Sequence, residues 1–337
     1  MISVVIPVFN GEKFIERSVL SVLNQTFKNI ELIVVNDGST DRTLEILEEI
    51  WKKYKPKGKV ISIENGGSAH ARNVGLDNIS GDYFCLLDSD DYLETNIFES
   101  IFNQYNSFDV CYYGYSDRDE NCVLNRKYED DFYYFDSITG TECAILKLRK
   151  KIWICHGSAV YSRRILEKNN IRYADGINHS EDLYFIICML VASNYVRCLK
   201  MNGVNIVTRK NSVMHSEYNS SFLGAIKSLD ILKKKILTLN NASYNHELLN
   251  LIDIQKMEHI CYVAKKIICS RNINFINKYK TIKSFSFNGF SLLPSLKKEI
   301  STSKLIEYYT LRKSIVLYFI MVKVFNFVQN ISKKLTN

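Results

Sequence analysis

Apolar and polar positions along residues 1–110 follow two alternating periods. Short runs rich in Val, Ile, Leu and aromatic residues end at polar or turn-forming residues, which predicts buried parallel strands. Between these runs, apolar residues recur every three or four positions, which predicts helices that pack one face on a sheet. This order predicts an α/β fold with a mostly parallel central sheet and helices on both faces. The predicted strands are Ile2–Ile6, Ile30–Asn36, Val60–Glu64 and Tyr83–Leu87.

Two helices are predicted between the first three strands, over Glu12–Gln25 and Asp41–Tyr54. In the second, apolar side chains at spacings of 3, 4 and 3 form one stripe, which we expect to face the sheet. The stripe consists of Leu44, Leu47, Trp51 and Tyr54.

After Asp109 the alternation becomes irregular. From about residue 221 onward the sequence predicts helices rich in Lys, Ile and Leu, without a strand. We therefore predict an α/β domain over residues 1–220 and a C-terminal helical region over 221–337. The elements predicted between residues 110 and 220 are strands Val110–Tyr115 and Val204–Arg209 and helices Gly140–Leu148 and Glu181–Asn194.

Composition and cysteine spacing narrow the class of protein. Of the 337 residues, 46% are hydrophobic and 24% are charged, which argues against a disordered or fibrous chain. The nine cysteines are scattered and never spaced as CxxC, so we expect a reducing cytosol and neither a disulfide framework nor a zinc knuckle. The start, Met1–Pro7, lacks a basic segment and a long apolar segment, so no signal peptide is expected.

Charge is unevenly distributed along the chain. Residues 1–110 contain 10 Lys and Arg against 17 Asp and Glu, whereas residues 221–337 contain 19 against 6. A basic region attracts polyanions such as an anionic membrane or nucleic acid, and a solvated helical face is the alternative. Because no RRM, KH or helix-turn-helix pattern is present, we do not expect nucleic-acid binding.

A cluster of acids directly follows the apolar run Tyr83–Leu87. A buried strand of a parallel sheet ends at the edge where α/β proteins bind ligands. Two carboxylates there can hold Mg²⁺ or Mn²⁺, which then takes diphosphate oxygens. The alternative is an acidic turn that caps the next helix. The cluster reads Asp88-Ser89-Asp90-Asp91.

Two other turns carry candidate ligand-binding groups. In Asn36–Asp41, Asp37 can accept from a base NH or a ribose hydroxyl, and Gly38 lets the backbone approach a ligand. In Asn65–Gly75, a Gly pair precedes Arg72, whose planar guanidinium suits phosphate. The alternatives are a capped strand-to-helix turn for the first and an ordinary ion pair for the second.

These motifs, in this order, resemble the family 2 glycosyltransferases of the GT-A fold, which is Rossmann-like. The resemblance is firm over residues 1–110 and looser to about 220. It implies an inverting transferase of the bacterial surface-polysaccharide type, with a UDP-sugar donor and Mn²⁺ or Mg²⁺. The motifs are Val5–Asn10, Asn36–Asp41, Gly67–Asn73 and Asp88–Asp91. By the same resemblance, the residues of the nucleotide pocket are Pro7, Val8, Phe9, Asn10, Asp37, Gly38, Gly67, Arg72, Asp88 and Ser89, and the metal ligands are Asp88 and principally Asp90.

Inverting transfer is a single displacement, so one carboxylate must take the proton of the attacking hydroxyl. The resemblance places this base in a Glu-Asp pair that opens a helix about ninety residues after the metal motif, where this sequence has Glu181 and Asp182. We predict Asp182 as the base and Glu181 as its substitute, with Ser180 capping the helix. The alternative is that both acids only complement the helix dipole.

Three other residues are candidates through the resemblance. His215 is predicted to close the metal site or the diphosphate pocket, and an ordinary polar residue is the alternative. Trp153 and His156 lie where the family tends to place its acceptor wall. Trp153 either stacks on a sugar ring or fills the core.

Residues 315–328 are strongly apolar, but fourteen residues that include Lys323 are shorter than the roughly 20 needed to span a bilayer. The segment has basic flanks, which favours an interfacial helix on an anionic membrane. The alternative is a terminal helix that packs on the domain or on a second copy in a homodimer. The flanking residues are Arg312, Lys313, Lys333 and Lys334.

The sequence thus predicts a metal-dependent inverting hexosyl- or N-acetylhexosaminyltransferase. We expect it to act in the cytoplasm, or at the inner face of the cell membrane, on a growing surface glycan such as capsule or lipooligosaccharide, or on a lipid-linked oligosaccharide. A sugar nucleotidyltransferase is one alternative, disfavoured because Pro7–Asn10 replaces a Gly-rich phosphate loop. The other is a non-catalytic nucleotide-binding or membrane-associated adaptor, which would be expected to lack Asp90 or Asp182.

Overall fold

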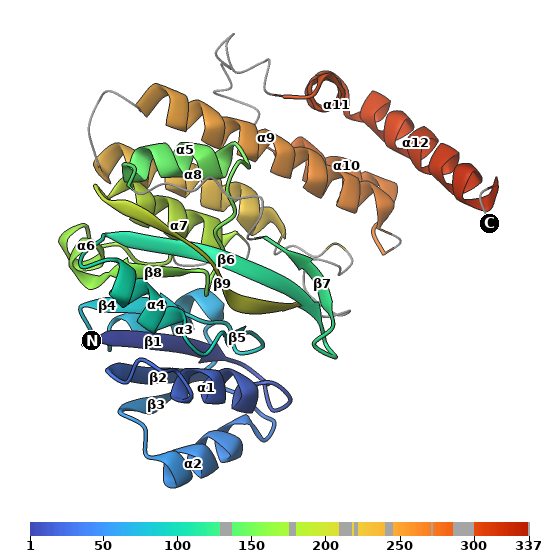
Figure 1. The fold of residues 1–337 in the computed structure, drawn as a ribbon. Coiled ribbons are helices and arrows are strands. Elements are labelled where there is room, and N and C mark those ends of the chain that lie inside the picture. Colours follow the sequence, from blue (N-terminus) through green and yellow to red (C-terminus); the bar gives the residue numbers. More distant parts are fainter. Residues whose placement is uncertain are drawn as a thin grey trace.

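The computed structural model describes most of the chain (Figure 1). The described ranges are 1–128, 137–174, 180–208, 218, 222–239, 245–270, 272–285 and 300–335, with side chains throughout except at 245 and 326–335. The strands are β1 (Ile2–Val8), β2 (Ile30–Asp37), β3 (Gly58–Ile63), β4 (Tyr83–Leu86), β5 (Tyr92–Leu93), β6 (Val110–Asp119), β7 (Leu124–Lys127), β8 (Ala159–Ser162) and β9 (Val196–Thr208). The helices are α1 (Ile15–Leu23), α2 (Thr43–Tyr54), α3 (Ser68–Leu76), α4 (Ile97–Gln104), α5 (Gly140–Leu148), α6 (Arg163–Lys168), α7 (Glu181–Val191), α8 (Phe222–Leu239), α9 (Asn245–Cys269), α10 (Phe275–Lys283), α11 (Thr302–Lys313) and α12 (Ile315–Leu335).

All the described strands belong to one mixed sheet, in the order β3-β2-β1-β4-β8-β6-β9-β5, with β7 paired to β6. The strands β1 to β4 run parallel, as βαβ units require. β8 is antiparallel to both of its neighbours, β4 and β6, while β6 and β9 are parallel to each other. The predicted α/β class with a Rossmann-like N-terminal half is confirmed.

Helices cover both faces of the sheet (Figure 1). Successive side chains of β1 point to opposite faces, so Val4 and Ile6 pack with α1, α2 and α4, whereas Val5 packs with α3. β1 is buried along its whole length because both faces are covered. This arrangement explains the continuous apolar run in its sequence.

The stripe predicted for α2 is wrong in part. Its fully buried residues are Thr43, Leu47 and Ile50, while Tyr54 is exposed. Thr43 turns inward because its hydroxyl accepts a hydrogen bond of 2.8 Å from the Gly11 backbone N–H. This polar anchor rotates the helix away from the stripe that hydrophobicity alone predicts.

The C-terminal helices extend the core on the α3 side of the sheet. α8 packs on α7, and α9 packs on both α5 and α8. One continuous core contains Phe185 of α7, Leu232 of α8 and Ile260 of α9. α11 and α12 lie at the edge of the molecule farthest from α2 (Figure 1). The boundary predicted at residue 220 falls in 219–221, outside the described residues, and stays a prediction.

Candidate active site

The carboxyl ends of β1, β2 and β4 meet at one edge of the sheet. Parallel pairing sets Val8 opposite Asn36 and Val5 opposite Leu86, so the residues that follow these strands lie close together. They border an open pocket of about 500 Å³. The pocket is lined by Pro7, Val8, Phe9, Asp37, Asn65, Gly67, Ser68, Ala71, Arg72, Asp88, Ser89, Asp90 and Glu181.

One wall of the pocket is held by the buried carboxylate of Asp37. It accepts hydrogen bonds from the backbone N–H groups of Gly66, at 2.7 Å, and Gly67, at 2.9 Å. Gly38 has a φ of +70°, and a Cβ there would lie 2.8 Å from the backbone N of Asn65. The turn before α3 is therefore fixed against the end of β2, and Gly38 shapes this contact from outside the pocket.

The loop after β1 forms the opposite rim. Pro7 and Val8 are buried, whereas the Phe9 ring is 51% exposed and free to contact a ligand. Asn10 does not line the pocket, but its Oδ1 accepts a hydrogen bond of 2.8 Å from the Thr40 backbone N–H. Asn10 therefore ties the loop after β1 to the loop after β2.

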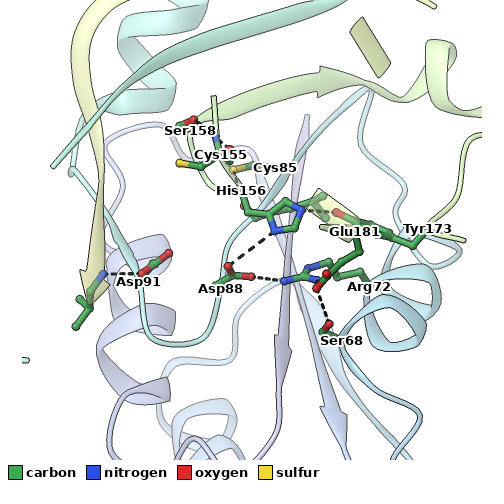
Figure 2. A network of polar contacts seen from close by, with 12 residues as sticks. Ser68, Arg72, Cys85, Asp88, Asp91, Cys155, His156, Ser158, Tyr173 and Glu181 are labelled. Atoms are coloured by element: carbon green, nitrogen blue, oxygen red, sulfur yellow. Dashed lines mark hydrogen bonds and ion pairs between the residues drawn. The ribbon is translucent and has the colours of Figure 1, made fainter. Parts of the chain in front are cut away.

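A buried guanidinium links the pocket to α7 (Figure 2). Arg72 Nη2 donates to Asp88 Oδ1 at 2.7 Å, and Nη1 donates to Glu181 Oε1 at 3.3 Å. Ser68 Oγ donates to the same Glu181 oxygen at 2.9 Å. Burial opposes the charge of Arg72, but attraction to Asp88, Tyr173 and Glu181 outweighs it and raises the pKa of the guanidinium.

The second oxygen of Asp88 faces His156, whose Nδ1 lies 3.8 Å from Oδ2 (Figure 2). His156 is buried, and its Nε2 is 2.7 Å from the Tyr173 hydroxyl. The Tyr173 ring in turn stacks on Phe185 with centroids 4.5 Å apart. Burial disfavours a charge on Asp88, but Arg72 and His156 more than compensate and hold its pKa well below the usual range. Asp88 is therefore an anion anchored from both sides.

The acidic turn is fixed by contacts from outside it. Arg17 Nη2 donates to the backbone oxygen of Asp90 at 2.8 Å, and Asp91 Oδ1 accepts from the Val207 N–H at 2.9 Å. Burial, together with the charges of Asp90 and Asp88, raises the pKa of Asp91. Negative charge is thus concentrated at this turn, and a divalent cation would relieve it.

The donor set also fits a hard cation. Mg²⁺ at phosphate sites typically takes one or two carboxylates and completes its shell with water and phosphate oxygens, and Asp88 and Asp90 offer two. Within the described ranges, no group of three or more His, Cys, Asp or Glu side chains is arranged to hold an ion. His215, the other predicted ligand, lies outside the described residues.

Glu181 and Asp182 open α7 as predicted, but the predicted cap is wrong. Ser180 has the left-handed conformation, with φ 60° and ψ 23°, instead of the extended one that N-cap residues adopt. Its hydroxyl lies 3.3 Å from His259 Nε2 and makes no hydrogen bond to the helix. Glu181 lines the pocket and is held by Arg72, whereas the half-buried Asp182 does not line it.

Lys147 is the cation that acts on Asp182 from α5. Burial lowers the pKa of this lysine, and attraction to the Asp182 carboxylate opposes that effect. Lys147 Nζ donates to the Ile154 oxygen at 2.6 Å, which fixes the segment that carries Trp153 and His156.

Trp153 is 37% exposed and lies edge-on to Tyr128, so it does not fill the core.

Sequence reasoning missed several of these contributors. Arg17 and Tyr173 carry no local signal, because each acts through residues elsewhere in the sequence, whereas Ser68 lies within the Gly67–Asn73 motif but was not singled out. Lys147 did carry a local signal, because it is a lone cation on a helix whose other residues include the buried Cys143, Ala144 and Leu148. The predicted Asn10, Gly38, Asp182, Trp153 and His156 are not among the residues that line the pocket.

Comparison with known proteins identifies the family. Residues 3–169 match Glycosyl transferase family 2. An uncharacterized glycosyltransferase of Haemophilus influenzae is 43% identical over 103 residues, which are 31% of this chain and 41% of that protein. Glycosyltransferase GlyG of Streptococcus pneumoniae is 29% identical over 255 residues, which are 70% of this chain and 79% of that protein. The first of these matches therefore spans less than half of the relative's length.

A solved structure shares the fold over nearly the whole chain. S. aureus TarS 1-349, in complex with UDP-GlcNAc, has a TM-score of 0.67 at 19% identity, covering 96% of this chain and 91% of that one. At this identity the likeness is one of fold, and it includes the C-terminal helices. The match over residues 3–169 and the shared architecture show that the chain belongs to glycosyl transferase family 2 and has the GT-A fold.

Proposed function

We propose that this protein is a metal-dependent inverting glycosyltransferase that takes a hexosyl or N-acetylhexosaminyl group from a UDP donor. The observation that carries the proposal is the pocket at the carboxyl edge of the sheet, where Asp90 faces the cavity beside the Arg72 network. The UDP-GlcNAc complex of the similarly folded TarS supports the choice of donor.

In this proposal the rim and the walls of the pocket bind the nucleotide. The exposed ring of Phe9 offers a stacking surface for the base. Ser68, the first residue of α3, and Arg72, one turn later, both line the cavity, and backbone N–H groups at a helix start favour phosphate. Asp37 keeps the Gly66–Gly67 turn in place, so its main role is to shape the pocket.

Asp90 and Asp88 would hold the Mn²⁺ or Mg²⁺, and His215 stays a candidate for a further ligand. When bound, the ion stabilises the charge that develops on the departing diphosphate. Asp88 is already oriented by Arg72 and His156, and Asp90 also lines the cavity. We therefore propose Asp90 as the principal ligand of the metal ion and Asp88 as a second, already oriented ligand.

Asp182 is proposed as the general base. The acceptor oxygen forms a bond to the anomeric carbon while the bond from that carbon to the diphosphate oxygen breaks, and Asp182 takes the hydroxyl proton. In the described part of the chain, the Asp182 carboxylate makes no hydrogen bond. Glu181, in contrast, is occupied by Ser68 and Arg72, which suits it to positioning more than to proton transfer.

For the acceptor we propose a growing surface glycan or a lipid-linked oligosaccharide. Trp153 offers a partly exposed ring for stacking on an acceptor sugar. His156 contacts Asp88 and is buried, so we propose that it acts on the acceptor side indirectly, by orienting that carboxylate.

Calorimetric titration of the full chain with UDP, GDP and CMP, with and without Mn²⁺, tests the proposal. We expect UDP binding that requires Mn²⁺, that is lost in Asp90→Asn, and that is retained in Glu48→Gln, a matched change of an exposed acid on α2. Binding of UDP that ignores Mn²⁺ would refute the metal assignment. The absence of any nucleotide binding would favour the adaptor alternative.

A further inference from the structure

The outer face of α12 is apolar and exposed. Between residues 315 and 325, five large apolar side chains each keep between 51% and 59% of their surface accessible. These side chains are Val316, Leu317, Ile320, Val324 and Phe325. A single exposed apolar residue is ordinary, but a contiguous group on one helix marks a contact surface.

Helical geometry places these residues on one side. At 100° per residue, Val316, Ile320, Val324 and Leu317 fall within about 100° of arc. Phe325 lies about 80° beyond Leu317, so the exposed side covers about half a turn. The opposite side carries Tyr318, Phe319 and Val322, which are buried against the protein. The helix therefore already uses one apolar face for packing, and the second is additional.

Neighbouring helices extend this surface. Ile306 of α11 shares an apolar hollow of about 410 Å³ with Met321 and Phe325 of α12. On the other side, Phe275 of α10 lies edge-on to Phe319 with centroids 5.0 Å apart, and Phe275 and Ile276 are both more than half exposed. We call the exposed residues of α10, α11 and α12 named here the apolar platform.

The charges around the apolar platform are mostly positive. Lys323 lies within the exposed arc of α12, and Arg312 and Lys313 are exposed just before the helix. From residue 300 onward the sequence contains a single acid, Glu307, which is paired with Lys265 at 2.6 Å. Within the described ranges, the surface therefore combines exposed apolar side chains with an excess of positive charge.

We propose that the apolar platform docks on an anionic lipid bilayer, with α12 lying in the plane of the interface. An interfacial helix inserts its apolar face at the boundary of headgroups and acyl chains and uses basic residues to contact anionic lipids. Among the helices of the described ranges, none is long and apolar enough to cross a bilayer. In this proposal α12 lies parallel to the membrane surface, and the proposal does not depend on the proposed transfer chemistry.

Charge decides between a membrane and a second copy of the chain. Two copies that met through the platform would bring Lys323, Arg312 and Lys313 of both chains together, and the described acid nearby is already paired. Like charges across an interface oppose association. An anionic bilayer supplies both the apolar phase and the opposite charge.

Vesicle sedimentation with the full chain tests the proposal. We expect binding to vesicles of phosphatidylcholine with phosphatidylglycerol that weakens as salt is added, and weaker binding to phosphatidylcholine alone. Ile320→Asp should reduce binding at least tenfold, whereas the matched control Leu237→Asp, which changes an exposed apolar residue on α8, should leave it unchanged. Lys323→Gln should weaken binding to the anionic vesicles by about fivefold, because one basic contact is lost.

A tryptophan reporter makes the test independent of folding effects in the acidic variant. Leu317→Trp places an indole on the platform, and its emission should shift to shorter wavelength only when anionic vesicles are added. Binding by Ile320→Asp equal to that of the unaltered chain would overturn the proposal. So would an intact chain that ignores vesicles but forms a dimer that Ile320→Asp dissociates, because the second copy would then be the occupant.

Discussion

Replacing Arg72 with methionine isolates the central contact of the site. Methionine keeps most of the side-chain volume but removes the guanidinium that lies between Asp88 and Glu181. Both carboxylates then lose their shared cation in a poorly solvated place. His156 still contacts Asp88, and Ser68 still contacts Glu181, so the substitution removes only the contacts of Arg72.

The expected cost follows from burial. Arg72 is 7% exposed and Glu181 is 16% exposed, and removing one partner of a buried ion pair costs about 3–5 kcal/mol. Asp88 is 33% exposed, and solvent screening there brings the expected loss to the low end, about 3 kcal/mol. With an unfolding entropy of about 2.1 cal/mol/K per residue, this loss lowers the Tm of a chain of this length by about 4 °C.

Thermal unfolding of the metal-free protein measures this loss. The matched control is Arg42→Met, which breaks an exposed pair with Glu45 on α2 and should leave the Tm unchanged. Arg72→Lys should fall between the two, because an ammonium keeps the charge but does not bridge both carboxylates. A Tm for Arg72→Met within 1 °C of the unaltered protein would show that the two carboxylates do not depend on Arg72, and would refute the reasoning.

Three other predictions follow from single contacts. Asp182→Asn should bind the UDP donor normally but lower the turnover number by about 10²–10⁴-fold in a sugar-transfer assay, and undiminished turnover would exclude it as the base. Burial raises the pKa of Glu258, but hydrogen bonds from Lys150 and Lys304 outweigh burial, so the net pKa is lowered. The contribution of Glu258 to stability is therefore fully present above its unfolded-state pKa of about 4.3 and is lost as the pH falls through the folded-state pKa. Glu258→Gln should therefore cost about 1 kcal/mol near pH 7, since both lysines are half exposed, and the melting temperatures of the two proteins should converge as the pH falls below the folded-state pKa of Glu258. Gly140→Ala should destabilise by about 3 kcal/mol in denaturant unfolding, because its Cβ would lie 1.7 Å from the Leu190 oxygen, and an unchanged midpoint would show that α5 and α7 can separate.

The N-terminal half could be predicted because local pattern and tertiary environment agree there. β1 and β2 are buried on both faces, so they appear in the sequence as uninterrupted apolar runs, and their ends were predicted to within two residues. The polar residues after these strands had to meet, since parallel strands share a carboxyl edge. The same geometry explains why Asp37 after β2 and Asp90 after β4, which the sequence predicts as ligand-binding residues, line one pocket, and their binding roles stay predictions.

Elements whose stability comes from distant contacts were not predictable. β5 has two residues and β7 is exposed at every position, so neither has an apolar period. β9 begins at Val196, well before the predicted start, because its first residues gain burial by pairing with β6. The prediction that Ser180 caps α7 was wrong for a similar reason. Its hydroxyl lies against His259 of α9, which is 79 residues away in the sequence.

The two acids of the Asp88–Asp90 motif have different surroundings in this structure, and Asp90 is the one that the sequence predicts as the principal metal ligand. Both oxygens of Asp88 are engaged by buried groups, Arg72 on one side and His156 on the other. The backbone oxygen of Asp90 accepts a hydrogen bond from Arg17, and Asp90 lines the cavity. Arg72 also holds Glu181, the neighbour of Asp182, so the same guanidinium sets the position of the metal motif and of the helix that carries the proposed base. A ligand that drew Asp88 away from Arg72 would thus change the charge around Glu181, so we expect binding at the pocket to affect the helix that carries the proposed base.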